Sequence, residues 1–286
     1  MKRRYCYVLL LLFAPVLAGA NNDKAAWRGP DQAVYVVTQN HYAEGFSPEG
    51  QTAKFGQLLA IEIYNPVAGP AEQQPLYKVG EHISLFSGGE KKGAIKIERV
   101  VPLQCDSSTA VVSGETSVRF AKETMALATN ASNVLSHANL QRQATDAEKA
   151  LAKHLAMTEF RKHSLPDQAA NDIEIDRSVV TKIAEGEGEM FVGNFSVKAN
   201  GAEHELFLIS KLDGSSAEMA RYHKMTDLLD GTDYEGYIFV DQLDLDGDGL
   251  DEIVVEMTAY ESEEFRVVKR INGVWTRVHV GGAGGC

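Results

Sequence analysis

The sequence has few basic residues and no cluster of them. Lysine and arginine together number 28 against 40 aspartates and glutamates, which gives a formal net charge of −12 at pH 7. Nucleic acids and anionic membrane surfaces both attract basic patches, and this chain offers none. We therefore expect no nucleic-acid partner, and a surface that attracts cations.

The sequence also lacks the motifs by which common catalytic sites are identified. It has no nucleophile elbow, zinc-protease helix, phosphate-cradling glycine loop or paired cysteine metal site with the required spacing. Its 8 histidines are scattered, and single histidines more often pack or face solvent than bind metal. The sequence therefore names no reaction and assigns no catalytic residue.

The first twenty residues are typical of a secretory signal peptide. Basic residues from Lys2 to Arg4 precede an apolar run from Tyr7 to Leu17, and Ala18-Gly19-Ala20 follows. The apolar run is too short to span a bilayer as a helix. We predict cleavage after Ala20, export to the periplasm or the extracellular space, and no membrane span once the signal is removed.

Cysteine is scarce, with 3 in the chain. Cys6 leaves with the predicted signal peptide, so Cys105 and Cys286 remain in the exported protein. An oxidising compartment favours a disulfide between them, worth roughly 4 to 5 kcal/mol in the chain-entropy model. Two free thiols are the alternative, because the sequence gives no distance between these residues.

Short β-prone runs separated by turns dominate the segment from Ala33 to Ser117. They predict an N-terminal β domain over residues 21–117, built as a small sandwich or a barrel. Ser87-Gly-Gly-Glu90 predicts a hairpin turn. The runs are 33–38, 58–64, 82–86, 94–101 and 109–112.

An alanine-rich segment follows and predicts a helical connector over residues 118–170. Thr145 and Glu148 have the spacing of a capping box, in which a hydroxyl and a carboxylate satisfy the free amides at a helix start. The expected helix begins there.

Residues 171–286 return to β-prone runs and predict a C-terminal antiparallel β domain. Asn272-Gly273 separates the last two runs and tolerates the positive φ angles of a type I′ hairpin turn. The predicted fold class is therefore α+β and mostly β.

One loop carries a pattern with clear chemistry. Asp244, Asp246 and Asp248 occupy positions 1, 3 and 5, a glycine follows at position 6, the carbonyl of Leu250 is at 7, and Glu252 is at 9. Calcium takes six to eight oxygen ligands with loose angular demands, and this spacing supplies them. We predict a Ca²⁺ site; an acidic turn without metal is the alternative.

Asp251 is not in the predicted ligand set, and we expect it to be solvated or to lie behind the ligands. Val255 stands at position 12, where an EF-hand needs a glutamate, and a β-prone run replaces the second helix. An Asp-x-Asp-x-Asp-Gly loop that leads into an apolar strand resembles the FG-GAP or VCBS class of extracellular calcium loops. The resemblance covers about thirty residues and names no activity.

Two functions fit these observations. The first is a non-enzymatic exported module in which calcium rigidifies a β domain that binds an unknown protein or surface ligand. The second is a periplasmic or secreted hydrolase in which the calcium site is only structural. Candidate residues for its active site are His41, Glu81, His82 and Asp106.

Overall fold

A computed structural model describes residues 27–38, 57–66, 79–102, 110–116, 118, 125–225, 236–259 and 262–285. The predicted signal peptide lies outside these residues, as do Cys105 and Cys286, so export and the disulfide stay predictions. No helix in these ranges is long and apolar enough to cross a membrane. The described chain is mostly β, as predicted, with three antiparallel sheets and one α-helix.

The first sheet is a closed barrel, one of the two architectures predicted for the N-terminal part. Its strand order is β1-β2-β5-β4-β3-β6. Strand β6 closes the barrel by pairing with both β1 and β3. The strands are β1 (Val34–Thr38), β2 (Gln57–Tyr64), β3 (His82–Ser87), β4 (Glu90–Pro102), β5 (Ala110–Thr116) and β6 (Met125–Thr129).

Strand β6 lies in the segment for which helix was predicted. All five of its residues are buried, and its two alanines face the barrel interior. Alanine favours helix in isolation, but pairing with two neighbouring strands satisfies the backbone and overrides that preference. The domain boundary drawn at residue 117 remains a prediction, and β6 belongs to the barrel although it follows that boundary.

Helix α1 (Asp146–Arg161) begins where the sequence predicts it. Thr145 Oγ1 accepts a hydrogen bond from the Glu148 amide at 3.3 Å, and Glu148 Oε2 accepts one from the Thr145 amide at 2.8 Å. The capping box is therefore confirmed. A short 3₁₀ helix, η2 (Asp167–Asp172), follows.

Two four-stranded sheets make up the C-terminal half. The order of one is β10-β9-β8-β7 and that of the other is β11-β12-β13-β14. The strands of the first are β7 (Glu174–Thr181), β8 (Met190–Ala199), β9 (Ala202–Lys211) and β10 (Ala217–Met225). Those of the second are β11 (Gly236–Leu243), β12 (Glu252–Ala259), β13 (Ser262–Ile271) and β14 (Val274–Gly285).

The two predicted hairpin turns are confirmed. Gly88 and Gly89 join β3 to β4 with φ angles of 61° and 80°, and Asn272 and Gly273 join β13 to β14 with φ angles of 52° and 79°. Both central residues of a type I′ turn need positive φ, which glycine and asparagine tolerate best.

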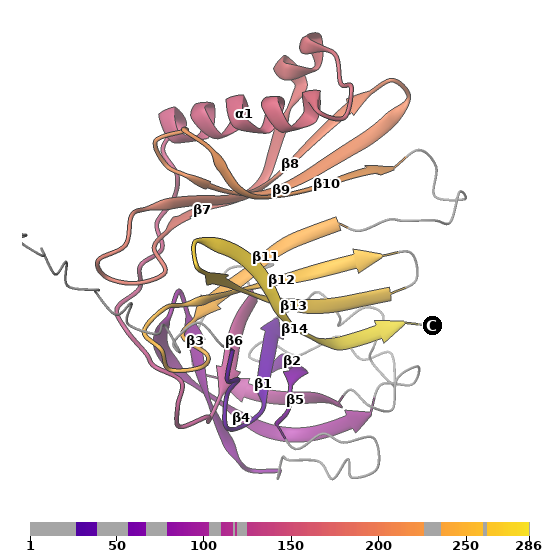
Figure 1. Ribbon diagram of the computed structural model, residues 1–286. Helices are drawn as coiled ribbons and strands as arrows, with labels where there is room; N and C mark the ends of the chain where they lie inside the picture. Colours follow the sequence, from indigo (N-terminus) through magenta and orange to yellow (C-terminus); the bar gives the residue numbers. More distant parts are fainter. Residues whose placement is uncertain are drawn as a thin grey trace, which may run out of the picture.

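The β11–β14 sheet is the middle layer of the molecule (Figure 1). One of its faces packs on the barrel, in a cluster that includes Leu127 and Phe265. Its other face packs on the β7–β10 sheet, in a cluster that includes Phe207 and Trp275. Helix α1 covers the far side of the β7–β10 sheet.

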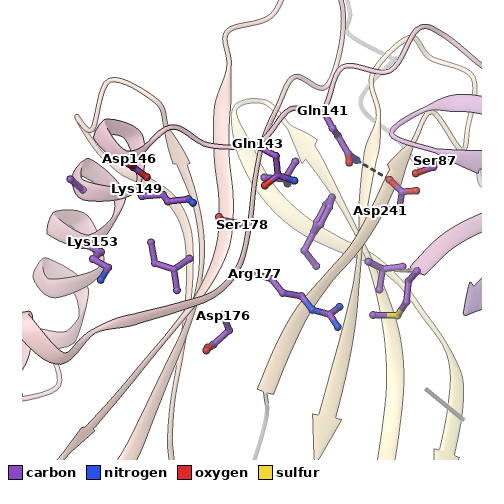
Figure 2. A pocket seen from close by; sticks show the side chains of 16 residues that line it. Ser87, Gln141, Gln143, Asp146, Lys149, Lys153, Asp176, Arg177, Ser178 and Asp241 are labelled. Carbon is purple, nitrogen blue, oxygen red and sulfur yellow. Dashed lines mark hydrogen bonds between the residues drawn. The ribbon is translucent and has the colours of Figure 1, made fainter. Parts of the chain in front are cut away.

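A cavity of about 820 Å³ opens where α1, β7 and β11 meet, with Ser87 and Met125 of the barrel at its edge (Figure 2). Three layers of the structure therefore contribute to one concave surface.

Candidate metal centre

The acidic loop, Asp244–Glu252, connects β11 to β12, so it lies between two strands as predicted. The run Ile253-Val254-Val255 follows Glu252 in β12 and is fully buried, which explains why a strand and not a helix follows the loop. Gly247 and Gly249 have φ angles of 74° and 91°, and these positive values allow the chain to turn tightly.

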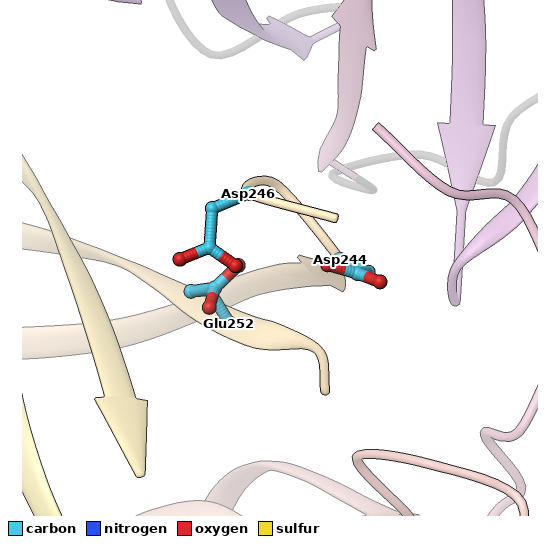
Figure 3. Close-up of side chains that lie close together, drawn as sticks. All are labelled: Asp244, Asp246 and Glu252. Atoms are coloured by element: carbon cyan, nitrogen blue, oxygen red, sulfur yellow. The ribbon is translucent and has the colours of Figure 1, made fainter. Parts of the chain in front are cut away.

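Three carboxylates gather in this loop. Asp244, Asp246 and Glu252 are all buried, and one carboxylate oxygen of each lies within 4.8 Å of the others (Figure 3). Buried carboxylates at such separations repel one another unless a cation lies among them. The cluster could therefore bind a metal ion.

Besides belonging to this cluster, Asp244 stabilises the conformation of the loop through its side chain. One oxygen accepts hydrogen bonds from the amides of Gly247 at 2.7 Å and Asp248 at 3.1 Å, and the other accepts from Gly249 at 2.8 Å. Burial raises the pKa of Asp244 to about 6, although these amides favour its charged form.

A lysine from the neighbouring strand provides positive charge within the cluster. The Nζ atom of Lys269 lies 2.8 Å from both oxygens of Asp246 and 2.8 Å from Oε1 of Glu252. It also lies 2.9 Å from Oδ2 of Asp248. The lysine side chain is only 1% exposed. The loop's carboxylates are thus arranged around an ammonium group of the chain itself.

One ammonium does not balance all of these carboxylates. Burial, together with the charge of Asp246, raises the pKa of Glu252 to about 8. Burial opposes the charged form of Lys269, but the charge of Glu252 and the carboxylate hydrogen bonds outweigh it and raise the pKa of the lysine. Burial is the main cause of the Glu252 shift, but negative charge nearby contributes to both shifts and leaves the cluster able to attract a further cation.

Lys269 is not among the site residues predicted from the sequence, although the sequence carries a signal for it. Phe265 and Val267 precede it at alternate positions of β13 and face the barrel-side core, so alternation places Lys269 on the same buried face. A lysine in a buried position needs a partner. Strand pairing supplies it, because Ile253 lies opposite Val268, and Glu252 and Lys269 are the next residues along the two strands.

The other loop residues have distinct places. Asp248 accepts a hydrogen bond from the Leu250 amide at 3.0 Å through its second oxygen. The side chain of Leu250 packs against the cluster between the two C-terminal sheets, which leaves its carbonyl as the only group it offers a cation. Asp251 is 1% exposed, so it lies behind the cluster and is not solvated.

Asp251 links the loop to other parts of the chain. Its carboxylate accepts from Nε2 of His137 at 2.7 Å and from Nε2 of Gln242 at 2.6 Å, and its amide donates to the carbonyl of Ile183 at 2.7 Å. The hydrogen bond to Asp251 raises the pKa of His137 to about 9. The imidazole is therefore charged at neutral pH and forms an ion pair.

The loop also contacts the segments around the barrel. The amide of Arg28, just before β1, donates to Asp246 at 3.4 Å, and the amide of Leu135, just after β6, donates to the carbonyl of Asp244 at 3.1 Å. The acidic loop is thus a junction at which the barrel and both C-terminal sheets are joined.

The structure describes two of the four hydrolase candidates and does not bring them into this site. His41 and Asp106 lie outside the described residues. Glu81 and His82 lie at the beginning of β3, and neither is among the residues that line the cavity at α1, β7 and β11.

Comparisons of the chain with protein-family models, with curated proteins and with solved structures gave no match.

Proposed function

We propose that the protein is an exported, non-enzymatic binding or structural module in which a cation held by the acidic loop stabilises the C-terminal sheets. The observation that carries this proposal is the position of Lys269, with its Nζ within 2.9 Å of three carboxylates. The loop forms around positive charge, and the same loop joins three layers of the fold. Its role is therefore structural and not catalytic.

Calcium is the external cation that this site would take. Its carboxylates are hard oxygen ligands, and the loop is built from alternate residues of a tight turn, as calcium sites in proteins often are. Asp246, Asp248 and Glu252 already contact Lys269, so an added cation competes with the ammonium for the same oxygens. Bound calcium would supply two positive charges and offset the negative surplus described above.

The test is a calorimetric titration of the protein with calcium, using wild type and Lys269→Met. Removing the competing ammonium should increase the affinity for calcium by at least tenfold, with about one ion bound per chain. Thermal melts of the Lys269→Met protein should show a low melting temperature in chelator and its recovery in calcium.

Asp246→Ala is the matched control, because it removes one carboxylate that contacts Lys269 and leaves the lysine in place. It should bind no calcium and show no difference between melts in calcium and in chelator. If Lys269→Met also fails to bind calcium, then the loop is a closed lysine salt bridge and the proposal of a calcium site is wrong.

A further inference from the structure

The cavity at α1, β7 and β11 has the size of a small-molecule site. Its volume of about 820 Å³ lies within the range of ligand pockets, roughly 300 to 1,000 Å³. Met125, Val179 and Val240 give it buried apolar walls, and Phe239 adds an aromatic ring. Ligand pockets usually combine apolar walls with a few polar groups, and this cavity is more polar, since ten of its sixteen lining residues are polar or charged.

Three cations line this cavity in a protein with a net charge of −12. Lys149 and Lys153 lie one helical turn apart on α1, and both point away from the helix toward β7 (Figure 2). Arg177 extends from the other side of β7, away from α1 (Figure 2). All three are partly buried, and none of these side chains forms a hydrogen bond or an ion pair with another residue in the described ranges. Unpaired, partly buried cations that line a cavity favour an anionic ligand.

On the β11 wall of the cavity, Asp241 favours a hydrogen-bond donor on the ligand instead of a negative charge. Its Oδ1 accepts from the amides of Gly88 and Gln242, both at 2.9 Å, and from Nε2 of Gln141 at 2.8 Å. Its Oδ2 is buried and has no partner among the described residues. When Asp241 is ionised, this buried oxygen without a donor costs about 1 to 3 kcal/mol, so a donor on the ligand would be favourable there.

The edge of β7 adds main-chain groups. On the outer side of this edge strand, the amide of Val180 donates to the carbonyl of Arg142 at 2.9 Å, and its carbonyl accepts from the amide of Arg142 at 2.8 Å. Ser178 is two residues earlier in the strand, so its main-chain amide and carbonyl point to the same outer side as those of Val180. Ser178 also lines the cavity. Its amide is a further donor for an anion.

We propose that this cavity binds a small amphipathic organic anion that also carries a hydrogen-bond donor. The anionic group lies against Lys149 and Lys153, the apolar body against Phe239 and its neighbours, and the donor toward Asp241. Asp146 and Asp176 also line the cavity, so a polyanion is disfavoured. The inference identifies the ligand class for the binding role proposed above, but it does not require calcium.

The test uses two fluorescent probes that differ in one group. 8-Anilinonaphthalene-1-sulfonate has an aromatic body, an N–H donor and a sulfonate, and N-phenyl-1-naphthylamine has the same body and donor without the sulfonate. The sulfonate probe should bind wild type at least tenfold more tightly than the uncharged one. The titrations are run in chelator and repeated in calcium, so that failure here is distinguishable from failure of the calcium site.

Variants locate the binding. Lys149→Gln combined with Lys153→Gln should weaken binding of the sulfonate probe about tenfold and leave the uncharged probe unchanged. Lys198→Gln, an exposed position on β8 away from the cavity, is the matched control and should change neither. Ala150→Trp, on the cavity wall, should block both probes. Thermal melts establish that each variant is folded.

Equal affinity for both probes, or an unchanged sulfonate affinity in the double lysine variant, would overturn the proposal. Binding of an extended acidic peptide along β7, with no binding of the sulfonate probe, would also overturn it and assign the cavity to a peptide instead.

Discussion

The chemistry of single residues in this protein is governed by charge in places that water does not reach. Lys269 is buried among three carboxylates, and Asp241 is buried with only one of its two oxygens satisfied. The charged form of a buried group is stable only if opposite charge or hydrogen bonds replace the lost water. Lys269 meets that condition through three carboxylates, whereas Asp241 meets it only in part. Replacing Lys269 should therefore destabilise the protein, and replacing Asp241 should stabilise it.

Lys269→Met keeps the length of the side chain and removes its charge. The carboxylates of Asp246 and Glu252 would then be buried without a cation, which costs about 3 to 5 kcal/mol. We expect a loss of that size in the free energy of unfolding, measured by urea denaturation in chelator at pH 7. Adding Glu252→Gln should recover part of the loss, and a double variant as unstable as Lys269→Met would contradict this explanation.

Asp241→Asn should stabilise the protein at neutral and higher pH. Burial raises the pKa of Asp241 from 3.8 to about 7. Between these values the folded state keeps a proton that the unfolded state releases, so the stability of wild type falls as pH rises and levels off above pH 7. The variant escapes this fall and should be more stable by roughly 2 to 4 kcal/mol at pH 8, with little difference below pH 4.

The measurement for Asp241→Asn is the difference in unfolding free energy between variant and wild type from pH 4 to pH 8. The difference cancels the titration of other groups that the two proteins share. A constant difference across this range would mean that Asp241 is not the titrating residue.

At the scale of elements, local sequence signals and tertiary contacts decide different features. The capping box at Thr145 and the turns at Gly88-Gly89 and Asn272-Gly273 involve neighbouring residues, and sequence patterns predict them. Strand β6 depends on two partner strands that are distant in the chain, and its composition suggested a helix. The acidic loop depends both on local sequence signals and on tertiary contacts.

Two glycines of the acidic loop allow the cost of backbone strain to be distinguished from the cost of losing a tertiary contact. Gly247 and Gly249 both have positive φ, but a Cβ on Gly247 would lie 2.4 Å from the carbonyl oxygen of Asn133, whereas one on Gly249 would meet nothing within 4 Å. Gly249→Ala should cost about 1 to 2 kcal/mol through backbone strain alone. Gly247→Ala should cost more, because the Asn133 backbone must also move.

Urea denaturation of the two alanine variants measures this difference. Equal losses of stability would show that the contact between the acidic loop and the segment after β6 contributes nothing.

At the scale of the whole molecule, the β11–β14 sheet shares one apolar cluster with the barrel and another with the β7–β10 sheet. The barrel interior and the α1 side of the β7–β10 sheet also have clusters of their own, but the acidic loop and the two shared clusters cross both boundaries of the middle sheet. Layers that share cores in this way are expected to unfold together.

The two tryptophans make this cooperativity measurable. Trp27 packs against the cluster between barrel and middle sheet, and Trp275 is buried in the cluster between the two C-terminal sheets. Fluorescence of Trp27→Phe and of Trp275→Phe should therefore give urea midpoints that agree with each other, after allowance for each variant's own stability by circular dichroism. In Trp275→Phe, Trp27 is the remaining tryptophan. If its fluorescence changes at a lower urea concentration than the circular dichroism of the same variant, the barrel unfolds separately.

The sequence by itself predicted the mostly β class, most of the described strands, the start of α1 and the acidic loop, because each depends on residues close together in the chain. Only the tertiary structure decided that β6 closes a barrel, that Lys269 lies among the loop's carboxylates, and that Lys149, Arg177 and Asp241 line one cavity. These features need strands and helices far apart in sequence to meet. Their energies depend on burial and on long-range charge, which no local pattern encodes.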